Sequence, residues 1–406
     1  MDFLMNTDIS VVVSAPTGSG KTTLFEIAII KLLEMWEHSD EDDKEQKIVY
    51  MAPIKALCTE KFKEWDNKFT SLGIRAVEIT GDSDNSDLLT IQHFNLILTT
   101  PEKWDALTRK WKDHTSLIQM IKLFLIDEVH LLNEERRGPT LEAVVSRMKT
   151  VQESLDYNET GDDWIRFIAV SATIPNIEDI AAWLSLKPKA AKFFKFGEEM
   201  RPVHLKRIVK AYPCKDERTI GYKFDLSLNY KLKQIIMQYS EGKPTLIDFQ
   251  QIFCSTRKSV LMTANVLCEQ ISFHFTSDQV ANIVSVSECL LENKLKEMVK
   301  RGIAYHHAGL VVSDRHYIEE LFRSGYLPVL VSTSTLAMGV NLPANLVIIK
   351  STEQYVCGGW QEYSEGQILQ MVGRAGRPQY GNSAAAIILT KEVNKVTQII
   401  VYLFLF

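Results

Sequence analysis

An eight-residue segment near the start of the sequence has the residue types and spacing of a phosphate-binding loop. It follows a short apolar stretch typical of a buried strand and precedes a run of helical length. Gly18 and Gly20 would let the backbone turn its N–H groups toward phosphate oxygens at a helix N-terminus. Lys21 would reach the β- and γ-phosphates, and Thr22 would ligate Mg²⁺. The alternative is a Gly-Ser turn before a surface helix. The predicted nucleotide-binding residues are Ala15, Pro16, Thr17, Gly18, Ser19, Gly20, Lys21 and Thr22.

Two adjacent carboxylates, Asp127 and Glu128, follow a second apolar stretch at residues 121–126. In an open parallel sheet, ligands bind beyond the carboxyl ends of the strands. We therefore expect Asp127 to hold Mg²⁺, directly or through water, and Glu128 to act as the general base for an attacking water. His130 could sense the nucleotide or contact the next strand. A solvated loop is the alternative. Together the two segments predict binding and hydrolysis of a nucleoside triphosphate with Mg²⁺.

The composition is that of an ordinary globular protein long enough for two or three domains. The chain has 406 residues, of which 46% are hydrophobic, and a formal net charge of −5. The negative net charge gives no sign of nucleic-acid binding, so any contact with nucleic acid must use a local basic surface. The six cysteines lack metal-ligand spacing, which favours reduced intracellular thiols. His306 and His307 are adjacent in a predicted strand and would point to opposite faces, which argues against a metal site.

Predicted strands and helices alternate in both halves of the chain. Residues 47–52 and 166–171 are strand-like in the first half, as are residues 303–306 and 329–333 in the second. Such alternation predicts parallel sheets flanked by helices, that is, an α/β fold. The first half contains the phosphate loop, and the second half has none.

Further short motifs occur in the order of one known family and extend over nearly the whole chain. The chain resembles the superfamily-2 DExH-box helicases of the Ski-like branch, and within it the DNA helicases of meiotic crossover. The motifs that support the resemblance are residues 52–57, 99–104, 127–130, 171–173, 304–310, 333–344 and 370–378.

The resemblance implies two tandem RecA-like domains with parallel sheets flanked by helices. We expect an ATP-binding helicase domain at residues 1–195, a connector at 196–230, a C-terminal helicase domain at 231–398 and an apolar tail at 399–406. It also implies that Arg374 and Arg377 act as arginine fingers on the γ-phosphate, with Gln370 and Gly339 facing the same cleft. The segment 171–173 would couple hydrolysis to movement of the strand. A solvated Gly-rich turn is the alternative for the arginines.

The resemblance further implies a track for single-stranded nucleic acid along loops of both domains. Backbone N–H groups, hydroxyls and lysines would contact phosphates there with modest sequence preference. For individual lysines, a solvated surface role is the alternative. Residues 354–363 lie where relatives have a strand-splitting β-hairpin, and a packed surface hairpin is the alternative. The predicted contact residues are Pro53, Lys55, Thr100, Lys103, Thr333 and Thr335.

The sequence departs from the family pattern in four places. It begins about one strand before the phosphate loop, without the upstream element that holds adenine in relatives. Residues 247–251 interrupt a stretch that is one strand in relatives, and we expect them to loop out before a strand that restarts at Ile252. No winged-helix or ratchet domain follows, and residues 399–406 fit no family motif. We therefore expect a truncated form, an isoform or a gene-model fragment.

Three functions stay open at this level. The first is a DNA helicase motor core that hydrolyses ATP to move 3′→5′ on single-stranded DNA and unwinds duplex or branched recombination intermediates in meiosis. The second is an RNA helicase of the same branch, and the third is a truncated ATP- and nucleic-acid-binding form unable to unwind. The resemblance implies single-stranded and branched DNA and other recombination proteins as partners, and a nuclear location. The apolar tail is too short to span a bilayer, so no membrane association is expected.

Overall fold

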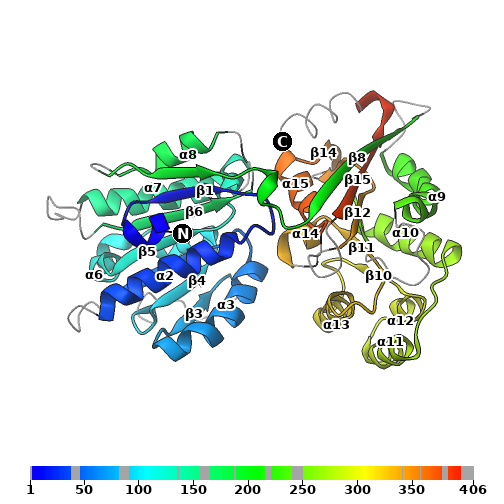
Figure 1. Cartoon of the computed structure of the whole chain (residues 1–406), viewed down its shortest axis with the longest axis horizontal. Helices are drawn as coiled ribbons and strands as arrows, with labels where there is room; N and C mark the ends of the chain where they lie inside the picture. Colours follow the sequence, from blue (N-terminus) through cyan, green and yellow to red (C-terminus); the bar gives the residue numbers. More distant parts are fainter. Residues whose placement is uncertain are drawn as a thin grey trace. The chain divides into compact units, whose positions relative to one another are not determined.

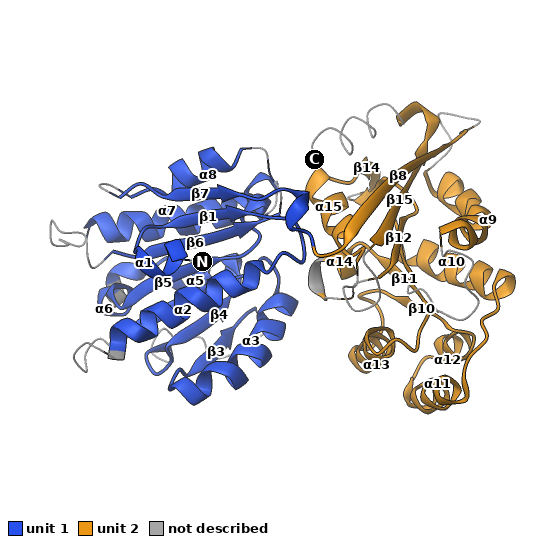
Figure 2. Ribbon diagram, in the orientation of Figure 1, with its two compact units in different colours: residues 1–201 blue, residues 202–406 orange. Residues whose placement is uncertain are grey.

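The computed structural model describes residues 2–37, 46–81, 91–134, 137–154, 164–172, 174, 176–186, 189–214, 221–239, 250–340, 342, 344–356, 358–376 and 383–394. The chain divides into two compact units, residues 1–201 and 202–406 (Figure 2). Each unit contains a parallel sheet flanked by helices. The predicted α/β class with two tandem domains is therefore confirmed.

The first unit is built on a seven-stranded sheet with the order β3-β4-β2-β5-β6-β1-β7 (Figure 1). All neighbouring strands pair in parallel, so their carboxyl ends lie at one edge of the sheet. That edge is where the phosphate loop and the acidic pair begin. The strands are β1 (Val11–Ser14), β2 (Lys47–Met51), β3 (Ala76–Ile79), β4 (Leu96–Thr99), β5 (Ile121–Ile126), β6 (Arg166–Ser171) and β7 (Lys192–Lys195).

Both faces of this sheet are buried, which explains why its central strands consist mostly of apolar residues. In β1, Val11 and Val13 join the core on one face, together with Phe25 and Trp65, and Val12 joins the core on the other. The first face is covered by α2 (Lys21–Glu37) and α3 (Lys55–Phe69). The second is covered by α5 (Pro101–Thr108), α6 (Thr115–Gln119), α7 (Gly138–Ser154) and α8 (Ile177–Leu184). A short helix, α1 (Asp2–Asn6), precedes β1.

The second unit has a six-stranded parallel sheet with the order β10-β11-β9-β12-β15-β8. Its strands are β8 (His204–Tyr212), β9 (Gln250–Cys254), β10 (Ile303–His306), β11 (Val329–Thr333), β12 (Leu346–Ile349) and β15 (Ser383–Lys391). Its helices are α9 (Gly221–Tyr239), α10 (Arg257–Gln270), α11 (Ser277–Cys289), α12 (Asn293–Lys300), α13 (Val312–Arg323), α14 (Thr335–Gly339) and α15 (Glu365–Gly373). A hairpin of β13 (Glu353–Val356) and β14 (Gly359–Glu362) lies between β12 and α15 in the chain.

Residues 196–230, which the sequence pattern predicts as a connector, contain regular structure of the second unit. Strand β8 pairs with β15 along its whole length, from His204 to Tyr212, and α9 begins at Gly221. Strand β8 lies at an edge of the sheet and is only half-buried, so its sequence mixes charged and apolar residues. Such a strand gives a weak periodic signal, which is why it is missed.

The expected restart of a strand at Ile252 is wrong by two residues. Gln250 and Gln251 already belong to β9, where they pair with β11 on one side and β12 on the other. The N–H of Gln250 donates to the carbonyl of Pro328, at 2.8 Å. Backbone pairing on both sides therefore outweighs the cost of burying two polar side chains. Residues 240–249 lie outside the described part of the chain, as does the predicted tail at 399–406.

Among the described helices, none has the length and apolarity that crossing a membrane would require.

Candidate active site

The predicted phosphate loop connects β1 to α2 at the carboxyl edge of the first sheet. Gly18 and Gly20 have φ values of +84° and +85°, in the left-handed region that favours glycine. Helix α2 begins at Lys21, so the positive end of its dipole lies at the loop. The Lys21 ammonium group donates to the carbonyl of Ala15, at 2.9 Å, which holds the lysine against the loop. Thr17, Gly18 and Gly20 are exposed and accessible to a ligand.

The acidic pair follows β5 directly and is anchored to β2. The N–H of Asp127 donates to the carbonyl of Met51, at 2.9 Å, which extends the β2–β5 pairing by one residue. One carboxylate oxygen of Asp127 accepts from the N–H of Glu128, at 2.9 Å, and the other accepts from the hydroxyl of Tyr50, at 2.7 Å. Desolvation and the neighbouring charge of Glu128 raise the pKa of Asp127 to about 6.

Glu128 has an unusual backbone conformation for its residue type. Its φ is +53°, and it is the one non-glycine residue with a positive φ in the described part of the chain. The left-handed region costs an L-residue about 1–2 kcal/mol. Strained conformations of this kind cluster at functional sites, where the surrounding structure holds them. The strain therefore supports a functional role for Glu128.

His130 lies beside Glu128 and contacts the segment that follows β6. Its Nδ1 accepts from the N–H of Ala172, at 3.4 Å, and lies 3.3 Å from Oε2 of Glu128. Burial lowers the pKa of His130, so the ring is neutral at physiological pH. Because Nδ1 accepts from Ala172, the neutral ring has no proton to donate to Glu128 from that side. Oε2 of Glu128 is buried without a hydrogen-bond donor among the described residues.

The structure brings the phosphate loop and the acidic pair together. The positive charge of Lys21 acts on both Asp127 and His130: it opposes the rise in the pKa of Asp127, and it adds to the lowering of the pKa of His130 that burial causes. The residues fit a nucleotide with Mg²⁺. Backbone N–H groups and a lysine suit phosphate, and the carboxylate of Asp127 together with Oε2 of Glu128, which is buried without a donor among the described residues, suits a cation or its water.

Ser14 and Tyr50 support this site but were not predicted from sequence. The Ser14 hydroxyl donates to the carbonyl of Ala172, at 3.1 Å, and accepts from the N–H of Ile174, at 3.2 Å. Ser14 thereby fixes the strand end beside the phosphate loop to the 171–173 motif. The only sequence signal for the role of Ser14 is that a single polar residue ends an apolar strand. Thr173 lies outside the described residues.

In the second unit, the predicted ATP-site residues that the structure describes lie in or directly after two short helices that pack together, α14 and α15. Arg374 follows α15, and its guanidinium donates to the carbonyl of Ala337 in α14, with Nε at 2.9 Å. Backbone bonds between Ala344 and the 374–376 segment join the same two motifs. Gln370 lies within α15, and Gly339 ends α14. Arg377 lies outside the described residues.

The predicted nucleic-acid contacts of the first unit follow two neighbouring strands. Pro53 and Lys55 come after β2, where Lys55 is exposed at the start of α3, and Thr100 and Lys103 come after β4. Because β2 and β4 are adjacent and parallel, these residues lie at one edge of the sheet. Thr100 is largely buried and Lys55 is exposed, while Pro53 and Lys103 are intermediate in exposure.

The corresponding residues of the second unit are Thr333 and Thr335, whose hydroxyls are 2.8 Å apart. The predicted hairpin is formed by β13 and β14. Tyr355 packs edge-on against Trp360, with ring centroids 5.7 Å apart, and is about half exposed. Contact of Thr333, Thr335 and the hairpin with nucleic acid stays a prediction.

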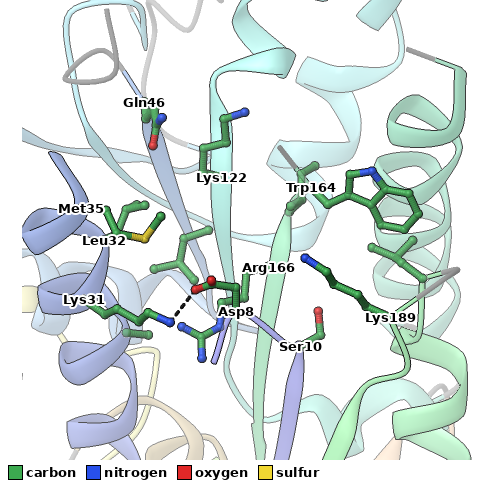
Figure 3. A pocket seen from close by; sticks show the side chains of 14 residues that line it. Asp8, Ser10, Lys31, Leu32, Met35, Gln46, Lys122, Trp164, Arg166 and Lys189 are labelled. Atoms are coloured by element: carbon green, nitrogen blue, oxygen red, sulfur yellow. Dashed lines mark hydrogen bonds and ion pairs between the residues drawn. The ribbon is translucent and has the colours of Figure 1, made fainter. Parts of the chain in front are cut away.

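A cavity of about 310 Å³ lies in the first unit at the opposite edge of the sheet, near the amino ends of β1, β5 and β6 (Figure 3). Its charged residues largely hold the N-terminal segment in place. Lys31 pairs with Asp8 at 2.5 Å and donates to the carbonyl of Thr7. Arg166 donates to the carbonyls of Ile9 and Leu4, at 3.2 and 3.0 Å. The cavity therefore lies apart from the predicted nucleotide-binding edge. Lys31 and Arg166, two of its charged residues, bind the N-terminal segment.

A phosphate-loop motif and an acidic pair at one edge of a parallel sheet, followed by a second parallel-sheet unit, are the features of a two-domain protein with a candidate nucleotide site in its first domain. The DEAD/DEAH box helicase family model matches residues 2–180, and the helicase conserved C-terminal domain matches residues 252–379. The chain belongs to the DEAD/DEAH box helicases. The family resemblance predicted from the motifs is confirmed.

Several curated relatives are similar along almost the whole chain. It is 51% identical over 397 residues to the probable ATP-dependent DNA helicase HFM1 of Homo sapiens, covering 96% of this chain and 27% of that protein. It is 40% identical over 389 residues to the ATP-dependent DNA helicase MER3 of Saccharomyces cerevisiae, covering 95% and 30%. Activating signal cointegrator 1 complex subunit 3 of Mus musculus is 37% identical, over 97% and 17%. The chain thus spans less than a third of the length of these relatives.

Proposed function

We propose that this chain is the ATP-dependent motor core of a DNA helicase that moves 3′→5′ along single-stranded DNA. The observation that supports this most strongly is the position of Lys21, Asp127 and Glu128 after β1 and β5, parallel strands of the first sheet whose carboxyl ends lie at one edge. The identity to proteins named ATP-dependent DNA helicases supports DNA as the track.

The proposed chemistry assigns one task to each residue of the site. The loop N–H groups and Lys21 bind the β- and γ-phosphates, and Thr22 with Asp127 holds Mg²⁺. Mg²⁺, when bound, neutralises charge on the phosphate oxygens. Glu128 orients the attacking water and accepts its proton. Arg374 and Arg377 would stabilise the charge that develops on the γ-phosphate.

We further propose that branched recombination intermediates in meiosis are the biological substrate, with other recombination proteins as partners in the nucleus. Lys55 and Lys103 in the first unit, and Thr333 and Thr335 in the second, would contact the phosphates of the track. Such contacts read little sequence, because they address the backbone.

The first test is the ATPase rate of this chain with and without single-stranded DNA, compared with Lys21→Ala. We expect DNA to stimulate hydrolysis in the natural chain, with no activity above background in the variant. Competition between DNA and RNA of the same sequence then decides the track, and strand displacement on forked duplexes tests unwinding.

Each outcome selects one function. Stronger stimulation by RNA would replace the DNA proposal with an RNA helicase. ATPase activity without strand displacement would support a motor that requires further parts of a longer protein to unwind. No ATPase above the Lys21→Ala background would leave an ATP- or nucleic-acid-binding role.

A further inference from the structure

Tyr50 is a fully buried residue of β2 whose hydroxyl contacts the acidic pair across the sheet. It donates to Oδ2 of Asp127 at 2.7 Å, although the two residues are 77 positions apart in the chain. The adjacency of β2 and β5 makes this contact possible, since Met51 pairs with Ile126 immediately before Asp127. A buried hydroxyl requires an acceptor, and here the acceptor is a carboxylate of the proposed metal site.

Two aromatic side chains hold the Tyr50 ring in place. Phe25 of α2 packs edge-on against it, with ring centroids 5.7 Å apart and an interplanar angle of 78°. Trp65 of α3 does the same at 5.0 Å and 75°. The indole N–H of Trp65 donates to Glu26, at 3.1 Å, which joins the two helices beside the ring. The hydroxyl therefore points at Asp127 from a fixed position.

This arrangement restrains the Asp127 carboxylate at both oxygens. Oδ1 accepts from the N–H of Glu128, at 2.9 Å, and Oδ2 accepts from Tyr50. Rotation of the carboxylate would break both bonds. Each oxygen keeps a second acceptor position, so a cation or its water can still bind. Phe25 lies one helical turn after Lys21, so the same ring also contacts the helix that begins at the phosphate loop.

We propose that Tyr50 is a positioning residue that orients the Asp127 carboxylate for the divalent cation bound with the nucleotide. The inference rests on the proposed function, because it takes Asp127 as the residue that holds Mg²⁺. A phenylalanine would fill the same space and keep both aromatic contacts. The hydroxyl is thus the part of the side chain that serves the site.

The test is Tyr50→Phe, which removes one oxygen atom and leaves the ring. Loss of a hydrogen bond that orients a metal ligand typically costs 10–100-fold in metal affinity. We expect the Mg²⁺ concentration for half-maximal ATPase activity to rise about tenfold, while ATP binding measured in EDTA stays within about twofold of the natural chain. A second readout that needs no turnover is the enhancement of ATP binding by Mg²⁺, which should fall in the variant.

Tyr305→Phe is the matched control. Tyr305 is also buried and donates its hydroxyl to a carboxylate, that of Glu292, but it lies in β10 of the second unit. The Tyr305→Phe variant should lower the free energy of unfolding by about as much as Tyr50→Phe does, without changing the Mg²⁺ concentration that ATPase activity requires. Circular dichroism checks the folding of each variant. If Tyr50→Phe unfolds, Phe25→Leu is the substitute, because it loosens the packing of the Tyr50 ring while keeping the hydroxyl. Its Mg²⁺ requirement should rise by less than the roughly tenfold expected for Tyr50→Phe.

The outcomes separate this inference from the proposed function. An unchanged Mg²⁺ requirement and unchanged Mg²⁺ enhancement in folded Tyr50→Phe would overturn the positioning role. An equal rise in Tyr305→Phe would also overturn it, because the effect would then be general destabilisation. If the natural chain lacks ATPase activity but binds ATP more tightly with Mg²⁺, the proposed function fails and the enhancement still decides the role of Tyr50. If the natural chain shows neither ATPase activity nor tighter ATP binding with Mg²⁺, both the proposed function and the role of Tyr50 are refuted.

Discussion

Gly138 lies against the backbone of Leu132, so closely that a Cβ atom at position 138 would stand 2.1 Å from the Leu132 carbonyl oxygen. Leu132 belongs to the short helical turn of residues Val129–Asn133, which follows the acidic pair directly. Gly138 begins α7, and its N–H donates to the carbonyl of Glu134, at 2.8 Å. The start of α7 thus supports the turn that follows Glu128.

Gly138→Ala should therefore disturb the acidic pair as well as the fold. The contact is with backbone, which cannot move aside as a flexible side chain could, so we expect a loss of about 1–3 kcal/mol in the stability of the first unit. ATPase activity should fall by more than the decrease in the fraction of folded protein that this loss of stability causes. Gly81→Ala is the control, because a Cβ there has nothing within 4 Å. Equal behaviour of the two variants in urea unfolding and ATPase assays would contradict the prediction.

The left-handed backbone of Glu128 predicts a difference between two neutral replacements. Asparagine tolerates positive φ better than glutamine does, so Glu128→Asn should be more stable than Glu128→Gln by up to about 1 kcal/mol. Both variants lack the carboxylate and should lose ATP hydrolysis while still binding ATP. Urea unfolding and single-turnover hydrolysis are the measurements. Equal stability of the two variants would show that the strain is relieved in solution.

The raised pKa of Asp127 predicts that the acid limit of ATP hydrolysis depends on Mg²⁺. Below about pH 6 the carboxyl is protonated and cannot hold the cation. Mg²⁺ binds the ionised form, so more Mg²⁺ should shift the midpoint to lower pH, by about one unit for each tenfold increase. Rate profiles at limiting and saturating Mg²⁺ check this, with ATP binding in EDTA as the control. A midpoint that does not move with Mg²⁺ would assign the limit to another group.

Lys350 and Asp225 form a buried ion pair, at 2.9 Å, inside the second unit. Both side chains are fully buried, and the ammonium group also donates to Asn229 and Thr263. Lys350→Met would leave the Asp225 charge uncompensated, which typically costs about 3–5 kcal/mol. The double variant Lys350→Met, Asp225→Asn should recover part of the loss.

An exposed pair provides the comparison for that experiment. Lys300 and Glu297 are 3.2 Å apart on the surface of α12. Lys300→Met should change stability by less than about 1 kcal/mol, because exposed ion pairs contribute little. Urea unfolding of the three variants is the measurement, and similar losses for Lys350→Met and Lys300→Met would refute the importance of burial.

The elements that could be predicted from sequence are those with continuous apolar strands. The strands before Ala15 and Asp127 are buried on both faces, so most of their residues are apolar, with Ser14 and Lys122 as the exceptions. Strand β8 was missed because an edge strand is half-buried and its sequence shows no clear period. The strand start at Gln250 was misplaced because two glutamines read as loop residues, whereas backbone pairing with β11 and β12 holds them in the sheet.

The residues of the candidate site divide in the same way. Lys21 and Asp127 lie in short contiguous segments, each directly after a strand, so a local pattern is enough to find them. Ser14 and Tyr50 act through partners far away in the chain, at Ala172 and Asp127. No spacing in the sequence indicates which hydroxyl will meet which acceptor.

The sequence by itself determined two α/β domains and the phosphate-loop motif in the first, because local residue order dictates strands, glycine turns and the groups at their ends. The order of the strands in the sheet was decided only by the tertiary structure. By placing β2 beside β5, that order set the Tyr50 hydroxyl on Asp127. Packing between distant segments determines the hydrogen bonds that the Asp127 carboxylate makes, and such packing leaves no periodic pattern in the sequence.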